Sequence, residues 1–441
     1  MDWKTLFAEH IKVIDKRFND ALIAEGLSGV LIAAGELKRQ FLDDMDYPFK
    51  VNPHFKTWVP LTQAAGSWIV KEVNKPPVLI FYSPDDYWHA PADFGPDFWR
   101  SHFVVETARS ADEVWAYLPE DRADFAFIGE WQQKLSPRLG QLEINPERLL
   151  ARLHFYRQFK TEYEIEAIKA ANTKAVRGHL AAKEAFQQKK SELDIHLAYL
   201  SAAHHAEHEL PYGNIVALNE HAAILHYQQQ VTTPPDNPLN FLIDAGAEQF
   251  GYAADITRTY AFSDGQWQEA IQAFDALQRS LVDAVQPGVS FPELHHKAHQ
   301  LISAWLIDFG FVQGAPEHIV ESGLSRAFFP HGLGHFIGLQ VHDVAGKQAN
   351  AEGERLPQPE HHPYLRLLHE LQPGHVVTVE PGVYFIPSLL KPWRNSDHRD
   401  MVNWAKVDEY MPYGGIRIED DVVVTENGHR NLTREAFDEQ A

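Results

Sequence analysis

Short runs of consecutive apolar residues predict the strands of the first third of the chain. They lie at residues 29–34, 78–82 and 125–128 and are separated by polar or helix-type stretches. A continuous apolar run of this length, bounded by turn residues, is typical of a strand that is buried on both faces. We therefore expect residues 1–158 to form a smaller α/β domain that begins with an amphipathic segment.

In residues 159–441, helix-type and strand-type patterns alternate. Apolar residues recur every three or four positions after Glu162, which predicts an amphipathic helix. Ser191 and Ser290 each open a capping-box pattern, so a helix is expected after each of them, and an apolar stripe between them predicts one more. Strand-type runs lie at residues 214–218, 223–227, 241–260, 336–341, 375–379 and 416–424. Two helices followed by strands thus occur twice, and residues 386–413 are expected to form an insertion that covers this domain.

Composition narrows the possible partners. The 441 residues include 39 Lys or Arg and 61 Asp or Glu, which gives a formal net charge of −22. A surface with this balance repels phosphate backbones and anionic lipid, so no nucleic-acid or membrane partner is expected. No run approaches the roughly 20 apolar residues that span a bilayer, and the N-terminus lacks a signal-peptide pattern, so a cytoplasmic location is expected. Since the chain has no cysteine, disulfides and thiolate metal sites are excluded.

Two aspartates lie in the run from Phe241 to Tyr260, which reads as a β-hairpin with a polar, glycine-containing middle. Asp244 falls in the first strand and Asp255 in the second, an odd number of residues apart. In a hairpin without a bulge, residues at such a separation can stand opposite each other on one face, with Cβ atoms roughly 5 Å apart. Two carboxylates would repel each other there, which indicates a divalent cation between them.

Further acids and histidines lie beside the later strands. Residues 330–343 form a glycine-rich stretch that contains His331, His335 and His342. Glu380 ends an apolar run and precedes a proline, which favours an extended backbone at this glutamate. Each of these groups is flanked by apolar residues, and burying a carboxylate among them is costly without a cation.

Arg417 and Glu419 are two residues apart in the last strand-type run and therefore share one face of it. With Glu419, the candidate ligands comprise four carboxylates and one imidazole, enough charge for two divalent ions roughly 3.5–4 Å apart. Oxygen-dominated ligation with one histidine suits Mn²⁺, with Co²⁺ or Zn²⁺ as other occupants. The ligands of this candidate di-metal hydrolase are Asp244, Asp255, His335, Glu380 and Glu419.

The same segments resemble the pita-bread metallopeptidases, the family of methionine aminopeptidase, aminopeptidase P and prolidase. The resemblance covers the whole chain and is strongest for the bacterial Xaa-Pro dipeptidases (prolidases), which include the organophosphorus acid anhydrolases. It implies an α+β fold in which a pita-bread (creatinase/aminopeptidase-like) catalytic domain, residues 159–441, follows the smaller domain, residues 1–158. It is carried by Arg157, Lys160 and residues 224–227, 330–335, 362–366, 379–382, 385–390 and 414–420.

The resemblance also implies how the metals are held. Asp244 would chelate one ion, His335 and Glu380 the other, and Asp255 and Glu419 would bridge them. A hydroxide shared by the two ions would attack the scissile carbonyl of an Xaa-Pro dipeptide. Glu380 would carry the proton to the leaving nitrogen.

Substrate contacts follow from the same resemblance. His342 and His331 would stabilise the tetrahedral intermediate and orient the substrate, and Arg417 would bind the carboxylate of the dipeptide. The family also implies a homodimer in which the N-terminal domain of one subunit closes over the site of the other, with the segment around Asp43 and Asp44 as the candidate cover. The other implied substrate contacts are His226, Tyr212 and Val341.

Three other functions are compatible with parts of this pattern. An aminopeptidase P that acts on longer Xaa-Pro peptides would use the same ligands. A catalytically inactive pita-bread binding protein would usually have lost some of them, and a di-metal phosphoesterase would not need the surrounding segments. Side activity on organophosphorus triesters and fluorides is expected, because a tetrahedral phosphorus centre resembles the peptidase intermediate.

For Arg417 and for the remaining histidines, a purely structural role is an alternative interpretation. Arg417 could be a strand residue that pairs with Asp420 or Glu419. The remaining histidine groups are expected to be solvated rather than to bind metal; they are His204, His205, His208, His295, His296, His299, His361 and His362.

Overall fold

The computed structural model describes residues 2–88, 90, 93–130 and 136–440 of the protein. The chain divides into two compact units. Unit 1 consists of Met1–Ala167, Phe250–Tyr252 and Gln348–Arg355, and unit 2 consists of Ile168–Gln249, Ala253–Lys347 and Leu356–Ala441.

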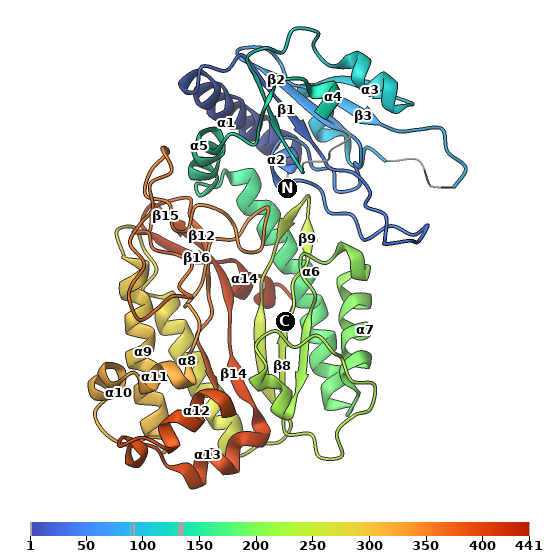
Figure 1. The fold of residues 1–441 in the computed structure, drawn as a ribbon. Coiled ribbons are helices and arrows are strands. Elements are labelled where there is room, and N and C mark those ends of the chain that lie inside the picture. The colour runs from blue at the N-terminus through green and yellow to red at the C-terminus, as the bar shows by residue number, and fades with distance from the viewer. Residues whose placement is uncertain (1, 89, 91–92, 131–135, 441) are drawn as a thin grey trace. The chain divides into compact units, whose positions relative to one another are not determined.

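Unit 1 is built on a mixed six-stranded sheet (Figure 1). Its strands are β1 (Gly29–Ala33), β2 (Trp68–Glu72), β3 (Val78–Tyr82), β4 (Val104–Ala108), β5 (Phe125–Ile128) and β6 (Glu143–Ile144), in the order β4-β3-β2-β1-β5-β6. Three of them, β1, β3 and β5, are the apolar runs that the sequence predicted as strands, and these predictions are confirmed. The helices are α1 (Trp3–Ala24), α2 (Pro53–Lys56), α3 (Ala111–Tyr117), α4 (Ser136–Leu139) and α5 (Glu147–Arg157).

The long helices of unit 2 form two pairs that flank its strands (Figure 1). They are α6 (Glu162–Gln187), which begins in unit 1, α7 (Glu192–Ala203), α8 (Gln266–Val282) and α9 (Phe291–Asp308). The predicted caps are confirmed, because the Ser191 hydroxyl accepts from the backbone N–H of Asp194 and the Ser290 hydroxyl from that of Glu293. The shorter helices are α10 (Pro316–Ser322), α11 (Leu324–Phe328), α12 (Pro387–Arg394), α13 (Trp404–Tyr410) and α14 (Leu432–Asp438).

The strands of unit 2 form small antiparallel sheets. One has the order β11-β8-β7, another β12-β15-β16, and β13 pairs with β14. A single bridge between Thr257 and Glu419 connects the first sheet to the segment that joins β14 to β15. The strands are β7 (Ile215–Leu218), β8 (Asn240–Asp244), β9 (Glu248–Gln249), β10 (Tyr252–Ala253), β11 (Thr257–Ala261), β12 (Val376–Val379), β13 (Gly382–Tyr384), β14 (Gly415–Arg417), β15 (Asp420–Thr425) and β16 (Gly428–Asn431).

Two apolar clusters hold these strands in place. One packs residues of α6 and α7 against β7 and β8. The other packs α8 and α9 against β12, β13, β14 and β15. Each sheet thus has one helix pair packed against it, and the polar side chains Asp255 and Glu419 near the strand ends are also buried.

Three predicted strands differ from the structure. Of residues 223–227, Ala223 ends a 3₁₀ segment, Asn219–Ala223, and the residues after it form a turn instead. Residues 336–341 contribute only an isolated bridge between Phe336 and Val377, because the glycine-rich chain turns back on itself after it. The run 416–424 is divided into β14 and β15, which pair with different strands.

The insertion predicted at 386–413 contains α12 and α13 and two short 3₁₀ segments. Among the described helices, none combines the length and the apolarity that crossing a membrane requires.

Candidate metal centre

Asp244 and Asp255 lie on one face of the β8–β11 pair but not directly opposite each other. Asp244 ends β8 and is in register with Thr257, while Asp255 lies two residues before that partner and outside the strand. The expectation of direct opposition was therefore wrong, because β11 begins only at Thr257. The two carboxylates are diagonal neighbours, and the Tyr212 hydroxyl oxygen lies 2.8 Å from Asp244 Oδ1 and 2.6 Å from Asp255 Oδ1.

His335 is oriented by a backbone carbonyl beside it. Its Nδ1 lies 2.9 Å from the carbonyl oxygen of Phe336. A carbonyl only accepts, so Nδ1 donates this hydrogen bond and Nε2 is directed to the acids. Nε2 lies 3.5 Å from Asp255 Oδ2 and 3.5 Å from Glu380 Oε1. Nε2 of a neutral His335 therefore presents a lone pair to the space between the two carboxylates, and Nε2 of a protonated His335 donates to them.

Thr378 on β12 fixes the loop that carries His335. The backbone N–H of Thr378 donates to the carbonyl of His335 at 2.9 Å, and the N–H of His335 lies 3.1 Å from Thr378 Oγ1. A side chain at Gly334 would collide with the Thr378 carbonyl, which explains why glycine precedes the histidine. The same hydroxyl lies 3.5 Å from Glu380 Oε1, so it contacts the segments of two candidate ligands.

Glu419 reaches the cluster from the segment between β14 and β15. Its N–H donates to the carbonyl of Thr257 at 3.1 Å, and Thr257 Oγ1 donates to Glu419 Oε2 at 2.6 Å. Three buried residues, Asp255, His335 and Glu419, each offer one ligand atom, and these three atoms lie within 4.8 Å of one another. Three segments far apart in sequence thus direct metal-binding atoms to one point.

Burial dominates the electrostatics of this cluster. It raises the pKa of Asp244, of Glu419 and, to about 7, of Glu380, and the charge of Asp255 raises each of them further. Burial also acts on Asp255, but a hydrogen bond and the positive charge of His335 hold the pKa of Asp255 below its ordinary value. Buried acids that ionise reluctantly are stabilised when a cation replaces their protons. The donor set, rich in carboxylate oxygen with one imidazole, fits two divalent ions.

We expect the metal-free protein to lose stability as pH rises from about 5 to about 7. Glu380 has an ordinary pKa of 4.5, raised to about 7 in the folded protein. Between these values the folded protein holds a proton that the unfolded chain releases, so unfolding is favoured by up to about 1.4 kcal/mol per pH unit for one such group. Urea unfolding at several pH values with and without Mn²⁺ measures this dependence. A free energy of unfolding that rises across this window without metal would contradict it.

Arg417 pairs with Asp244 across the site. Its Nη2 lies 2.7 Å from Asp244 Oδ2. The alternative pairing with Asp420 or Glu419 is not found, because Asp420 is taken by Arg258 at 2.6 Å. Arg417 is thus a neighbour of a candidate metal ligand.

A chain of hydrogen bonds continues from Arg417 to His331. Arg417 Nη1 donates to the Tyr384 hydroxyl at 2.8 Å, and that hydroxyl lies 2.8 Å from His331 Nε2. His331 Nδ1 lies 2.8 Å from the Gly332 carbonyl, so Nδ1 donates and Nε2 accepts from Tyr384. Burial and the charge of Arg417 lower the pKa of His331 to about 3, which keeps the ring neutral.

The other predicted substrate contacts lie at the edge of the cluster. The ring of His342 is 4.4 Å from that of His335, centroid to centroid, and Val341 beside it is half-buried. His226 is exposed, and its charge lowers the pKa of both His331 and His342.

Tyr212, predicted as a substrate contact, also touches two candidate ligands, Asp244 and Asp255. Replacing it with phenylalanine is expected to weaken metal binding by about 10- to 100-fold, because groups that hydrogen-bond to ligands orient them. Competition with a chromophoric chelator measures this, and Tyr364→Phe, at a tyrosine that is 69% exposed, is the matched control. Equal metal affinity in both variants would show that the Tyr212 hydroxyl has no such role.

Sequence reasoning missed three residues that support the cluster: Thr257, Thr378 and Tyr384. The spacing offered a signal for the two threonines, because Thr257 follows Asp255 by two residues and Thr378 precedes Glu380 by two, and residues at this spacing in extended chain share a face. Tyr384 had no such signal, since its partners His331 and Arg417 come from other segments.

Comparison with known proteins places this chain in a family. Residues 5–155 match the family model "Xaa-Pro dipeptidase, N-terminal domain", and residues 166–426 match "Metallopeptidase family M24". An Xaa-Pro dipeptidase of Shewanella oneidensis is 46% identical over 426 residues, 97% of each chain. One of Shewanella baltica is 45% identical over 429 residues, again 97% of each chain.

Solved structures show the same fold. Aminopeptidase P of Escherichia coli superposes with a TM-score of 0.70 at 24% identity and covers 96% of this chain and 94% of its own. Aminopeptidase PepP of Pseudomonas aeruginosa gives a TM-score of 0.71 at 21% identity, with coverages of 96% and 95%. These likenesses support the pita-bread, α+β fold that the sequence predicted. The M24 family model matches more than half of the chain, and a relative at 46% identity covers 97% of it, so the chain belongs to metallopeptidase family M24.

Proposed function

We propose that this protein is a metal-dependent Xaa-Pro dipeptidase. The observation that carries the proposal is the convergence of buried acids on His335, in a chain whose relatives at 46% identity are Xaa-Pro dipeptidases. The aminopeptidase P structures are at most 24% identical and support the fold alone. The proposal that the substrate is a dipeptide and not a longer peptide therefore rests on the relatives at 46% identity.

In this proposal the chain holds two divalent cations, with Mn²⁺ expected and Co²⁺ or Zn²⁺ as other occupants. Asp244 would bind one, His335 and Glu380 the other, and Asp255 and Glu419 both. Such a pair supplies Lewis acidity and makes water nucleophilic at neutral pH. Oxygen ligands outnumber nitrogen four to one, which favours Mn²⁺.

Side chains at the site would transfer the proton, orient the substrate and stabilise the developing charge. Glu380 Oε2 lies 3.7 Å from His331 Nδ1, and its carboxyl would take up the proton of the attacking water and pass it to the leaving proline nitrogen. His331 and His342 would orient the substrate and stabilise the charge of the tetrahedral intermediate. His226, Tyr212 and Val341 would contact the substrate.

Arg417 would contribute to substrate binding with only part of its guanidinium. Three of its N–H donors already contact Asp244, Tyr384 and Thr257. A guanidinium has five such donors, so at most two are left for the carboxylate of a dipeptide. We propose that Arg417 acts mainly by positioning Asp244.

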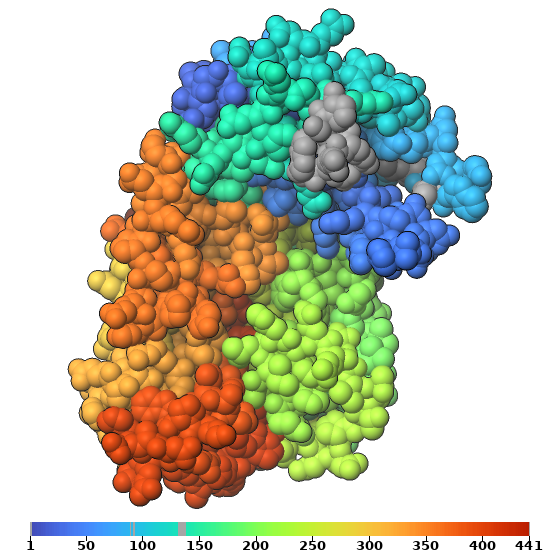
Figure 2. Space-filling view, in the orientation of Figure 1, coloured from blue at the N-terminus to red at the C-terminus, as the bar shows by residue number. Residues whose placement is uncertain are grey.

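We further propose a homodimer in which the N-terminal domain, residues 1–158, covers the site of a second subunit formed by residues 159–441. The loop around Asp43 and Asp44 supports this, because its side chains Phe41 and Leu42 are 87% and 91% exposed in the single chain. Figure 2 shows blue atoms of the N-terminal segment on the surface of unit 1. Sedimentation of Leu42→Ser beside the unchanged protein tests the dimer. If the variant forms the same dimer, Leu42 does not contribute to the proposed interface.

The first experiment is Ala-Pro hydrolysis by metal-stripped protein before and after addition of Mn²⁺. We expect no cleavage without metal and recovery with it. If protein shown to bind two ions leaves Ala-Pro intact, the metal site stands and the dipeptidase proposal fails. Ala-Pro-Ala tested in parallel separates a dipeptidase, which leaves it intact, from an aminopeptidase P, which cleaves it.

Side activity on organophosphorus compounds is proposed for the same site. A tetrahedral phosphorus centre resembles the intermediate of peptide hydrolysis, so groups placed for one also stabilise the other. A fluorophosphonate that is not hydrolysed by Mn²⁺-loaded protein active on Ala-Pro would exclude it.

A further inference from the structure

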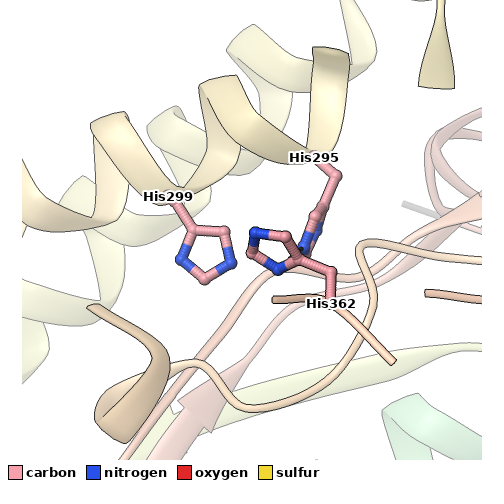
Figure 3. Close-up of side chains that lie close together, drawn as sticks. All are labelled: His295, His299 and His362. Atoms are coloured by element: carbon pink, nitrogen blue, oxygen red, sulfur yellow. Dashed lines mark hydrogen bonds between the residues drawn. The ribbon is translucent and has the colours of Figure 1, made fainter. Parts of the chain in front are cut away.

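Three histidines outside the acid cluster face one another in unit 2. His295 and His299 lie one turn apart on α9, and His362 reaches them from the loop before β12 (Figure 3). The expectation that they are solvated was wrong for this group, since His295 and His299 are 2% and 1% exposed. Only His362 is partly open to solvent. These three residues are called the three-histidine cluster below.

The geometry of the cluster brings ring nitrogens together. One nitrogen from each ring lies within 4.8 Å of the other two. His295 Nε2 and His362 Nδ1 are 2.8 Å apart, and the ring centroids of His299 and His362 are 5.0 Å apart. Residues four apart on a helix project from the same face, so His295 and His299 form the fixed half of the cluster and His362 the adjustable half.

Two nitrogens of the cluster lack a hydrogen-bond partner among the described residues. They are His295 Nδ1 and His299 Nε2, and both are buried. A buried polar atom without a partner costs stability that an apolar side chain of similar size would not. Packing alone therefore does not account for imidazoles at these positions.

The protonation state suits ligation. Burial lowers the pKa of His295 and His362 and brings that of His299 to about 3, and neighbouring histidines add to each shift. Neutral imidazole is the form that binds a metal ion. Binding near pH 7 would therefore not have to displace a charge-bearing proton from these rings.

The surroundings hold the rings in position. His299 Nδ1 lies 3.0 Å from the buried Ser325 hydroxyl, which leaves Nε2 as the atom directed into the cluster. Such a partner on the second ring nitrogen is typical of metal-binding histidines. The backbone of the loop is held at His362, whose carbonyl accepts from Leu365 N–H at 3.2 Å and from Gln358 Nε2 at 2.6 Å, while the His362 ring remains the adjustable part.

We propose that the three-histidine cluster binds one transition-metal ion, Zn²⁺ or a similar nitrogen-preferring cation, with a fourth position open to solvent beside His362. Zinc–nitrogen distances are about 2.0–2.1 Å, so the rings must close in and the ion replaces the His295–His362 hydrogen bond. The charge of Arg326 opposes a cation here, because it already lowers the pKa of His299 and His362.

This site would select a different metal from the acid cluster. Three nitrogens favour Zn²⁺, Co²⁺ or Ni²⁺ over Mn²⁺, whereas a carboxylate-rich site accepts Mn²⁺. The two sites are also separate, because the ring of Phe329 packs against His299 on the one hand and against His331 on the other, with both centroid distances 4.9 Å. The inference does not depend on the proposed peptidase function.

The test counts Zn²⁺ bound to the full-length protein after chelation, reloading and dialysis. We expect the unchanged protein to hold one more equivalent than His362→Gln or His299→Gln, while His361→Gln, at the exposed neighbouring histidine, keeps the full count. Arg326→Gln is expected to tighten this Zn²⁺ several-fold. An equal count in the unchanged protein and in folded His362→Gln would overturn the proposal.

Anomalous diffraction at the zinc edge locates the ion directly. A peak among the three rings in crystals of the unchanged protein, absent in His362→Gln, is the expected result. A peak only at the acid cluster would refute the proposed site without affecting the dipeptidase proposal. Conversely, failure to cleave Ala-Pro would leave the zinc count and this peak unchanged, so the two proposals fail separately.

Discussion

Replacing Asp255 with asparagine is expected to lower kcat/KM for Ala-Pro by about a thousandfold or more. Asparagine keeps the shape and the contact with Tyr212, which lies 2.6 Å from the carboxylate, but removes the charge that His335 faces. A loss of about 4 kcal/mol of transition-state stabilisation corresponds to this factor. The measurement is initial rates at saturating Mn²⁺, with metal content determined on the same samples.

Asp264→Asn is the matched control, because it makes the same change at an aspartate that is exposed and lies beyond the end of β11. We expect its kcat/KM to stay within twofold of the unchanged protein. Asp255→Asn protein that retained activity within tenfold would remove Asp255 from the proposed set of ligands.

Replacing Asp420 with asparagine is expected to destabilise the protein by about 3–5 kcal/mol, because it breaks an ionic network centred on a buried carboxylate. Asp420 is wholly buried and receives Arg258 Nη2 at 2.6 Å and Arg434 Nε at 2.8 Å. The side-chain amides of Gln278 and Asn431 donate to the same carboxylate. The substitution leaves two guanidinium groups without the charge they compensate.

Urea unfolding measures this loss, and Asp408→Asn is its control. Asp408 pairs with Arg394 at the surface, with both side chains about half exposed, so its loss is expected to cost at most about 1 kcal/mol. Although burial alone would raise it, the pKa of Asp420 is held below its ordinary value by the two arginines. The stability it contributes is therefore present above that ordinary value and lost as pH falls below it. Equal losses in the two variants would show that the buried network contributes no more than a surface pair.

The network around Asp420 also bears on the metal centre. Arg258 Nη1 donates to the carbonyls of Thr257 and Glu419 at 2.8 and 2.7 Å. Both residues contribute to the acid cluster, Glu419 as a candidate ligand and Thr257 as its hydrogen-bond donor. We therefore expect Asp420→Asn to weaken metal binding as well as folding.

The burial of two histidines on α9 differs from the prediction for a reason that is visible in the sequence. His295 and His299 were expected to be solvated, yet they continue the buried stripe of α9 that runs through Phe291, Leu294 and Ala298. Spacings of three and four residues place them on the core face. The helical period could have predicted their burial, but not that His362 would join them from a loop.

Two other differences, at residues 336–341 and at the start of β11, could not be predicted from the local sequence pattern. Residues 336–341 have the composition of a strand but form one bridge only, because whether an extended segment pairs depends on a neighbouring strand with free backbone groups. The start of β11 at Thr257 moved Asp255 out of the ladder for the same reason.

The sequence by itself determined the types of the candidate ligands, their position at strand ends and the helices that flank them, because these depend on the side-chain period and on capping residues close along the chain. Only the tertiary structure decided their partners. Tyr212 lies between two aspartates, Arg417 pairs with Asp244, and His362 joins two histidines of α9 from a distant loop. Such contacts join residues tens to hundreds of positions apart, and they are chosen by how the strands and helices pack together, which no local pattern of residues specifies.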